Sequence, residues 1–150
     1  MDSKRLGTAF AWGVLATVVM SIPMLIATAT GVAPMPEPIP KALVGLVFGE
    51  TLPLPAHMAL AVISHLAYGG VWAGILAAST RPVTIWKGLG LGVFLWLLMQ
   101  IIVLPLLDWG AFGTAETPAI AVGTLVLHLI YGAVVGWTID RRHAHNPAPA

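Results

Sequence analysis

The chain has 150 residues, of which 58% are hydrophobic and 9% are charged, and its formal net charge at pH 7 is +1. Soluble domains carry about 25% charged residues, so a water-soluble globular domain is excluded, and no basic stripe indicates a nucleic-acid partner. The absence of cysteine excludes disulfides, thiolate chemistry and cysteine-ligated clusters. We therefore expect an all-α integral membrane protein, with residues 1–150 forming a single membrane domain.

Four apolar stretches are long enough to cross a bilayer, which takes about 20 residues of helix. They cover residues 7–29, 57–79, 86–107 and 118–138. Small residues recur within them at four-residue spacing, as at Gly132 and Gly136. In lipid such residues let helices approach closely and pack by van der Waals contact. The pattern predicts a four-transmembrane-helix bundle whose principal partner is the lipid bilayer.

The first stretch also has features of a cleaved signal peptide. Lys4 and Arg5 precede it, and Ala27, Thr28 and Ala29 form the small-x-small pattern of a cleavage site. The apolar run is longer than the usual core of a signal peptide. We therefore expect a retained helix.

The connection after the first stretch is rich in proline, with Pro34, Pro36, Pro38 and Pro40. Proline at this density favours extended chain. The next apolar run, residues 41–48, is too short to span the membrane. We expect it to form a short interfacial or re-entrant helix on the outer face.

Most of the positively charged residues lie at the two ends of the chain and around the second connection. Lys4 and Arg5 precede the first stretch, Arg81 and Lys87 flank the second connection, and Arg141 and Arg142 follow the last stretch. Cytoplasmic loops carry an excess of lysine and arginine. We therefore predict a multi-pass protein of the cytoplasmic (inner) membrane with both termini in the cytoplasm and residues 141–150 as a cytoplasmic tail.

A five-residue pattern occurs twice and uses both tyrosines of the chain. The segments are His65-Leu66-Ala67-Tyr68-Gly69 and His128-Leu129-Ile130-Tyr131-Gly132. Gly-Val pairs followed by Met20 and Met99 also match between the halves. The pattern predicts two parallel two-helix repeats, residues 7–79 and 86–138, which places His65 and His128 at the same depth near the bilayer centre.

An ionisable side chain inside a membrane helix is costly, so the two histidines are candidate functional residues. Three interpretations stay open. The first is a membrane binding or accessory subunit, with a membrane protein partner or as a homo-oligomer, in which His65 and His128 form a structural pair. The second is a b-haem electron-transfer protein in which both histidines ligate the haem iron. The third is a small-molecule or proton transporter.

The haem interpretation assigns a role to each residue of the pattern. Gly69 and Gly132 lie one turn after the histidines, on nearly the same face, and leave room for a flat macrocycle. Tyr68 and Tyr131 would bond a propionate or orient an imidazole ring. For a transition metal alone, two histidines without intramembrane carboxylates leave the coordination incomplete. No nucleophile–base pair or phosphate loop is present, so enzymatic activity is the least supported class.

The H-L-x-Y-G pattern in a short, glycine-rich chain with four spans resembles small uncharacterised bacterial membrane proteins grouped as domains of unknown function. The resemblance covers most of residues 7–138. It implies a four-helix membrane fold and brings no catalytic assignment that could be mapped onto these residues.

Overall fold

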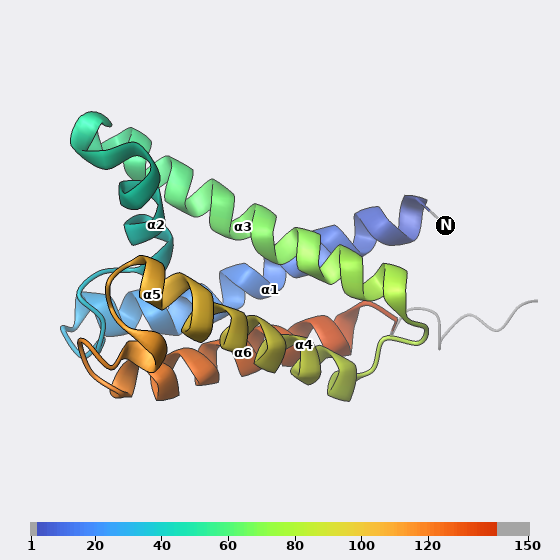
Figure 1. The fold of residues 1–150 in the computed structure, drawn as a ribbon. Coiled ribbons are helices and arrows are strands. Elements are labelled where there is room, and N and C mark those ends of the chain that lie inside the picture. Colours follow the sequence, from blue (N-terminus) through green and yellow to red (C-terminus); the bar gives the residue numbers. More distant parts are fainter. Residues whose placement is uncertain (1–2, 141–150) are drawn as a thin grey trace, which may run out of the picture.

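The computed structural model describes residues 3–140, and every regular element in that range is a helix (Figure 1). The predicted all-α class is confirmed. Four helices are long and apolar enough to cross a membrane: α1 (Ser3–Ala29), α3 (Leu54–Ser79), a third span (Ile85–Leu106) and α6 (Ala119–Thr138). The largest difference from the predicted bounds is at the start of α1, and the predicted tail, residues 141–150, lies outside the described residues.

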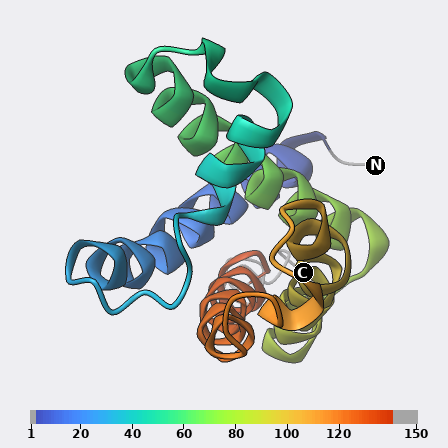
Figure 2. The same cartoon turned by 60° about the vertical axis from the view of Figure 1, so that its left-hand side comes forward.

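The four spans form two packed pairs. α1 packs on α3, the first part of the third span (α4, Ile85–Leu98) packs on α6, and contact between α1 and α6 joins the pairs (Figures 1 and 2). Glycines make both seams: a Cβ atom on Gly13 would lie 2.5 Å from that of Ala73, and one on Gly88 would lie 2.1 Å from the carbonyl oxygen of Gly132. Close backbone contact of this kind holds helices together in lipid. We call the pair α1/α3 the first hairpin and the pair α4/α6 the second hairpin.

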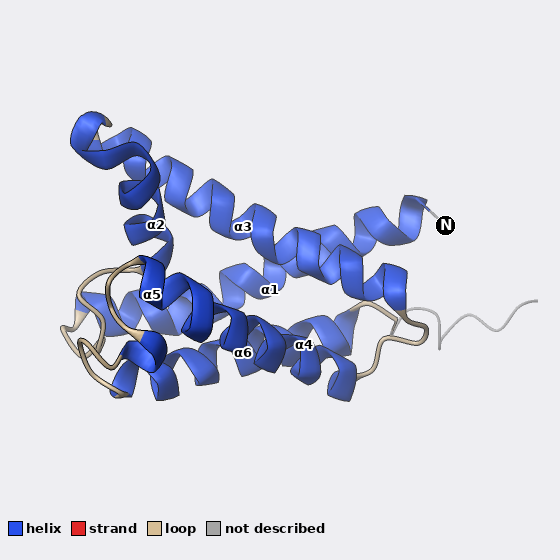
Figure 3. Cartoon of the chain, viewed as in Figure 1, coloured by secondary structure: helices blue, strands red, loops and turns tan. Residues whose placement is uncertain are grey.

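The third span is helical throughout (Figure 3). Its backbone hydrogen bonding changes in the second half of the span. A π-helical turn, η2 (Met99–Val103), separates α4 from a last short turn, α5 (Leu104–Leu106). Leu104 N–H donates to the carbonyl oxygen of Met99, five residues back. Pro105 has no N–H, so the regular bonding is interrupted there. The sequence predicted one span over residues 86–107 and did not indicate this turn.

The short apolar segment forms helix α2 (Ile39–Phe48), which begins two residues before its predicted start at residue 41. The earlier start follows from Pro40, because proline is tolerated in the first helical turn. α2 packs on α3, where the ring of His57 bonds through Nε2 to the carbonyl oxygen of Lys41 at 2.9 Å. In Figure 1, α2 stands across the spans at one end of the bundle. We call this end the α2 end.

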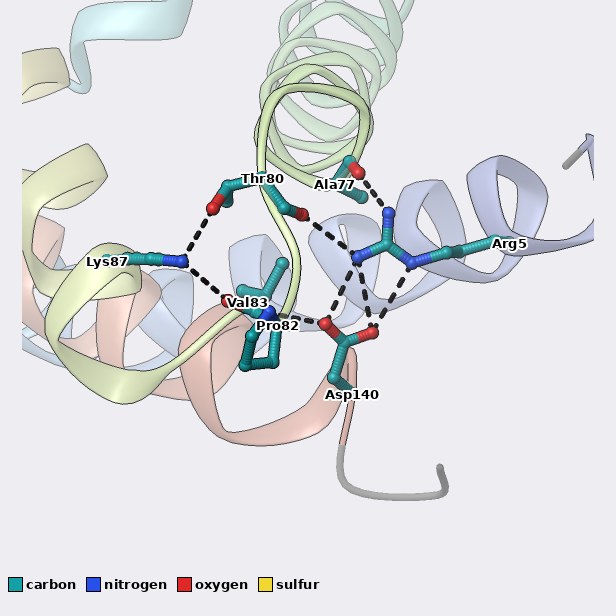
Figure 4. Close-up of polar contacts among 7 residues, drawn as sticks. All are labelled: Arg5, Ala77, Thr80, Pro82, Val83, Lys87 and Asp140. Atoms are coloured by element: carbon teal, nitrogen blue, oxygen red, sulfur yellow. Dashed lines mark hydrogen bonds and ion pairs between the residues drawn. The ribbon is translucent and has the colours of Figure 1, made fainter. Parts of the chain in front are cut away.

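The opposite end, which we call the Arg5 end, is closed by a buried ion pair (Figure 4). Arg5 Nη2 lies 3.1 Å from Asp140 Oδ2, and the guanidinium also donates to the carbonyl oxygens of Ala77 and Thr80. Asp140 accepts a further bond from the backbone N–H of Val83 at 2.5 Å. The cluster ties α1 to the ends of α3 and α6. Removing one partner of a buried pair costs about 3–5 kcal/mol.

Candidate functional site

A pocket of about 250 Å³ lies between the two hairpins and receives side chains from all four spans. We call it the inter-hairpin pocket. α2 and the preceding connection form its wall at the α2 end, through Met35, Ile39, Pro40 and Leu43. The polar residues that line the pocket are Thr17, Ser64, His65, Tyr68, Thr124, His128 and Tyr131. The remaining lining is apolar except for the backbone of Gly69, so the polar groups stand out as possible contacts for a ligand.

The structure brings the two repeated histidines into this one pocket. His65 comes from α3 and His128 from α6, and the rings are near enough for an electrostatic interaction. The Nδ1 atom of His128 bonds to the carbonyl oxygen of Thr124 at 2.8 Å. A carbonyl only accepts, so Nδ1 carries the proton, and Nε2 of the neutral ring keeps its lone pair. His65 makes no hydrogen bond to the described residues, so none of these residues selects its tautomer.

The two tyrosines line the same pocket in different ways. Tyr131 is 2% exposed, and its hydroxyl donates to the carbonyl oxygen of Gly69 at 2.5 Å. This bond joins the second hairpin to the backbone of the first. Tyr68 is 41% exposed and packs edge-to-face with Trp72, with ring centroids 6.1 Å apart. Of the two tyrosines, Tyr131 is the one with a hydrogen bond across the hairpins among the described residues, and this bond goes to a backbone carbonyl rather than to a histidine.

The glycines of the pattern serve helix contacts. A Cβ atom on Gly69 would lie 1.9 Å from Thr17 Oγ1 and 3.2 Å from the ring of Tyr131. One on Gly132 would lie 2.4 Å from the carbonyl oxygen of Gly88, and Gly132 does not line the pocket. The space that the haem interpretation reserves for a macrocycle is thus already occupied by neighbouring helices at both glycines.

The size of the pocket also bears on haem. Pockets for drug-sized ligands have volumes of about 300–1,000 Å³, and the inter-hairpin pocket, at about 250 Å³, is smaller than that range. A haem would enter only if the hairpins moved apart. Within residues 3–140, no group of three or more histidine, cysteine, aspartate or glutamate side chains is arranged to hold a metal ion.

One buried polar pair beside the pocket was not predicted from the sequence. Gln100 in the π turn is fully buried, and its Nε2 donates to Thr124 Oγ1 at 2.9 Å. Its Oε1 has no hydrogen-bond partner within the part of the chain that the structure describes. Thr124 is also the residue whose carbonyl holds His128. A glutamine inside an apolar span is a signal that could have identified this pair.

The sequence comparisons identify the family. Residues 3–149 match the family of unknown function DUF6789, so the chain belongs to that family over nearly its whole length. The resemblance to an uncharacterised family is therefore confirmed. No curated protein and no solved structure matches the chain.

Proposed function

We propose that this chain is a small integral membrane protein, a binding or accessory subunit, that holds a ligand in the inter-hairpin pocket through His65 and His128. The observation that carries the proposal is that both histidines of the repeated pattern line one pocket although they lie on different hairpins. Intramembrane histidines are rare because burying them in lipid is costly. A pair that converges on one hollow is best explained by a shared ligand.

Different groups around His65 and His128 would contribute different contacts to a ligand. The leucine, methionine and valine side chains of the pocket supply apolar contact area, and the imidazoles supply polar contacts that fix the orientation of the ligand. Nε2 of His128 is held ready as an acceptor or a metal ligand, because Thr124 holds the other ring nitrogen. Ser64 and Tyr68 line the pocket and are also exposed on the surface of α3. The ligand therefore has a route from the bilayer.

The proposal includes an orientation, with both termini on the cytoplasmic side of the inner membrane. Among the described residues, the Arg5 end carries most of the basic side chains, because Lys4 and Arg5 begin α1, Arg81 connects α3 to α4, and Lys87 lies in the first turn of α4. At the α2 end, the charge of Lys41 is balanced by Glu37, with Nζ 2.7 Å from Oε2. The excess of positive charge at one end supports a cytoplasmic location for it.

A b-type haem protein is the second candidate. The fixed tautomer of His128 favours it, because an iron ligand needs a free Nε2 and a partner for Nδ1. The small pocket and the packed glycines count against it. Transport of a small molecule or a proton remains the third, since it would use the same residues.

The test is retention of a ligand by purified protein. Wild type, His65→Ala, His128→Ala and the control His57→Ala are expressed with haem supply and extracted in mild detergent. Native mass spectrometry and absorption spectra, before and after dithionite, are then recorded. His57 is a matched control because it lies on α3 but outside the pocket.

We expect wild type and His57→Ala to retain a bound species that both pocket variants lose. A Soret band with sharp reduced α and β bands would identify that species as haem. Folded wild type without any bound species, or equal retention by all four proteins, would contradict the proposal. Proteoliposome flux that depends on His65 and His128, without retained ligand, would favour the transporter.

A further inference from the structure

The methionines of the chain gather at the inter-hairpin pocket. Of the six in the sequence, Met20, Met24, Met35 and Met99 line it. Met20 comes from α1 and Met99 from the π turn of the third span, and they are 7% and 8% exposed. Met58, on α3, is 41% exposed and does not line the pocket. Four of the six methionines therefore line one interior pocket.

The donor set of the pocket is soft and uncharged. It offers thioether sulfurs and imidazole nitrogens, and its lining contains no carboxylate. Magnesium and calcium ions require oxygen ligands, whereas thioether ligands select Cu(I) and imidazole also suits copper. A monovalent ion also brings less charge into an apolar site than a divalent one, which lowers the cost of burial.

Each half of the chain supplies one sulfur and one nitrogen from matching positions. Met20 and Met99 match in the sequence, as do His65 and His128, and all four line the pocket. Nε2 of the neutral His128 ring keeps its lone pair because Nδ1 is bonded to Thr124, and the ring of His65 is free of hydrogen bonds to the described residues. Methionine side chains have three rotatable bonds, so the two thioethers can turn toward an ion between the imidazoles.

We propose that the inter-hairpin pocket binds a Cu(I) ion through His65, His128, Met20 and Met99. This assignment rests on the proposed function, because it names the ligand that the paired histidines hold. The ion binds as Cu(I) and leaves as Cu(I), so no electron donor or acceptor is required.

Methionine also fills irregular gaps in apolar cores, and that role predicts a different response to substitution. Leucine conserves the volume and apolar character of methionine but removes the sulfur. Met20→Leu and Met99→Leu therefore keep a packing role and abolish a ligand role. Met58→Leu is the matched control outside the pocket.

The experiment titrates full-length protein in detergent with Cu(I) against a chromogenic Cu(I) chelator, under anaerobic conditions with ascorbate. Titration with Ag(I), followed by calorimetry, provides a probe of the same softness that is inert to redox change. We expect one ion per chain in wild type and in Met58→Leu. Affinity should fall at least about tenfold in Met20→Leu and Met99→Leu and in His65→Ala and His128→Ala. Copper X-ray absorption should show both sulfur and nitrogen neighbours.

No Cu(I) binding by folded wild type, or unchanged affinity in both leucine variants, would overturn the copper assignment. Thermal unfolding of each variant without metal establishes that it is folded before the titration is interpreted. If copper does not bind but an organic species is retained and depends on the histidines, the copper site fails and the proposed function stands. If neither binds, both fail.

Discussion

The two H-L-x-Y-G segments share a sequence pattern but have different surroundings. In α6, Tyr131 is 2% exposed and bonded to the first hairpin, whereas in α3, Tyr68 is 41% exposed. The difference follows from packing: α6 lies against both α4 and α1, whereas α3 packs on α1 and on the short helix α2. Similar residues at matching positions therefore lie in a packed interior in one helix and on a partly exposed surface in the other.

The comparison shows that the candidate site is asymmetric. His128 is held by the carbonyl of Thr124, and Thr124, Leu127, His128 and Tyr131 of its helix line the pocket. His65 has no such bond to the described residues, and its helix supplies the side of the pocket that reaches the surface. We infer that the α6 copy positions a ligand and that the α3 copy admits it.

The largest expected effect of a substitution is at the glycines of the two copies. Gly132→Ala places a Cβ atom 2.4 Å from the backbone oxygen of Gly88, whereas Gly69→Ala meets the side chain of Thr17 at 1.9 Å. Overpacking a core costs about 1–3 kcal/mol. We expect both variants to lose stability by this amount, measured as the free energy of unfolding by steric trapping in bicelles.

The two glycine variants should then differ in whether a second substitution restores the lost stability. Adding Thr17→Ala to Gly69→Ala removes the obstructing oxygen and should restore part of the lost stability. No side-chain truncation should rescue Gly132→Ala, because its obstacle is backbone. Gly74→Ala is the control, since its Cβ atom would meet nothing within 4 Å. Equal rescue at both sites would show that the two seams are equivalent.

A smaller difference is expected at the tyrosines. Tyr131→Phe removes the bond to the carbonyl oxygen of Gly69, and hydrogen bonds between membrane helices contribute about 0.6 kcal/mol on average. Tyr68→Phe removes no hydrogen bond across the hairpins and should leave the free energy of unfolding unchanged. The same unfolding measurement checks both. An equal loss in the two variants would mean that Tyr68 has a comparable bond in the membrane.

The smallest expected effect is spectroscopic and involves no loss of stability. Because Thr124 accepts from Nδ1 of His128, we expect that ring to hold its proton on Nδ1. The ring of His65 should populate both tautomers in the absence of ligand. Solid-state NMR of ¹⁵N-histidine protein in lipid, assigned with His65→Ala and His128→Ala, distinguishes the two patterns. A mixed tautomer at His128 would remove the asymmetry.

The spans were predictable because each is a run of about 20 apolar residues, and lipid permits such a run only as a helix. The gathering of His65 and His128 in one pocket was likewise accessible from the repeated pattern. Contacts between residues that are distant in the sequence could not be predicted from it. The pairing of Arg5 with Asp140 and the seam at Gly132 depend on which helices meet, and that is not encoded in the local pattern.

The π turn illustrates the same limit within one helix. The predicted span over residues 86–107 gave no indication that the turn at Met99–Val103 would widen. The wider turn contains Gln100, which bonds to Thr124. A local rule reports that proline removes a donor. Which turn of the helix changes its hydrogen bonding to compensate for the missing donor depends on the neighbouring span.

His65 and His128 lie on separate hairpins and line one pocket between the membrane spans. The direct test is cross-linking of the variant His65→Cys/His128→Cys by a short bis-maleimide in native membranes. The chain has no other cysteine. We expect intramolecular cross-linking of this pair but not of His65→Cys/Val126→Cys, since Val126 is 52% exposed on another face of α6. Failure to cross-link the first pair, or equal cross-linking of both, would contradict the account.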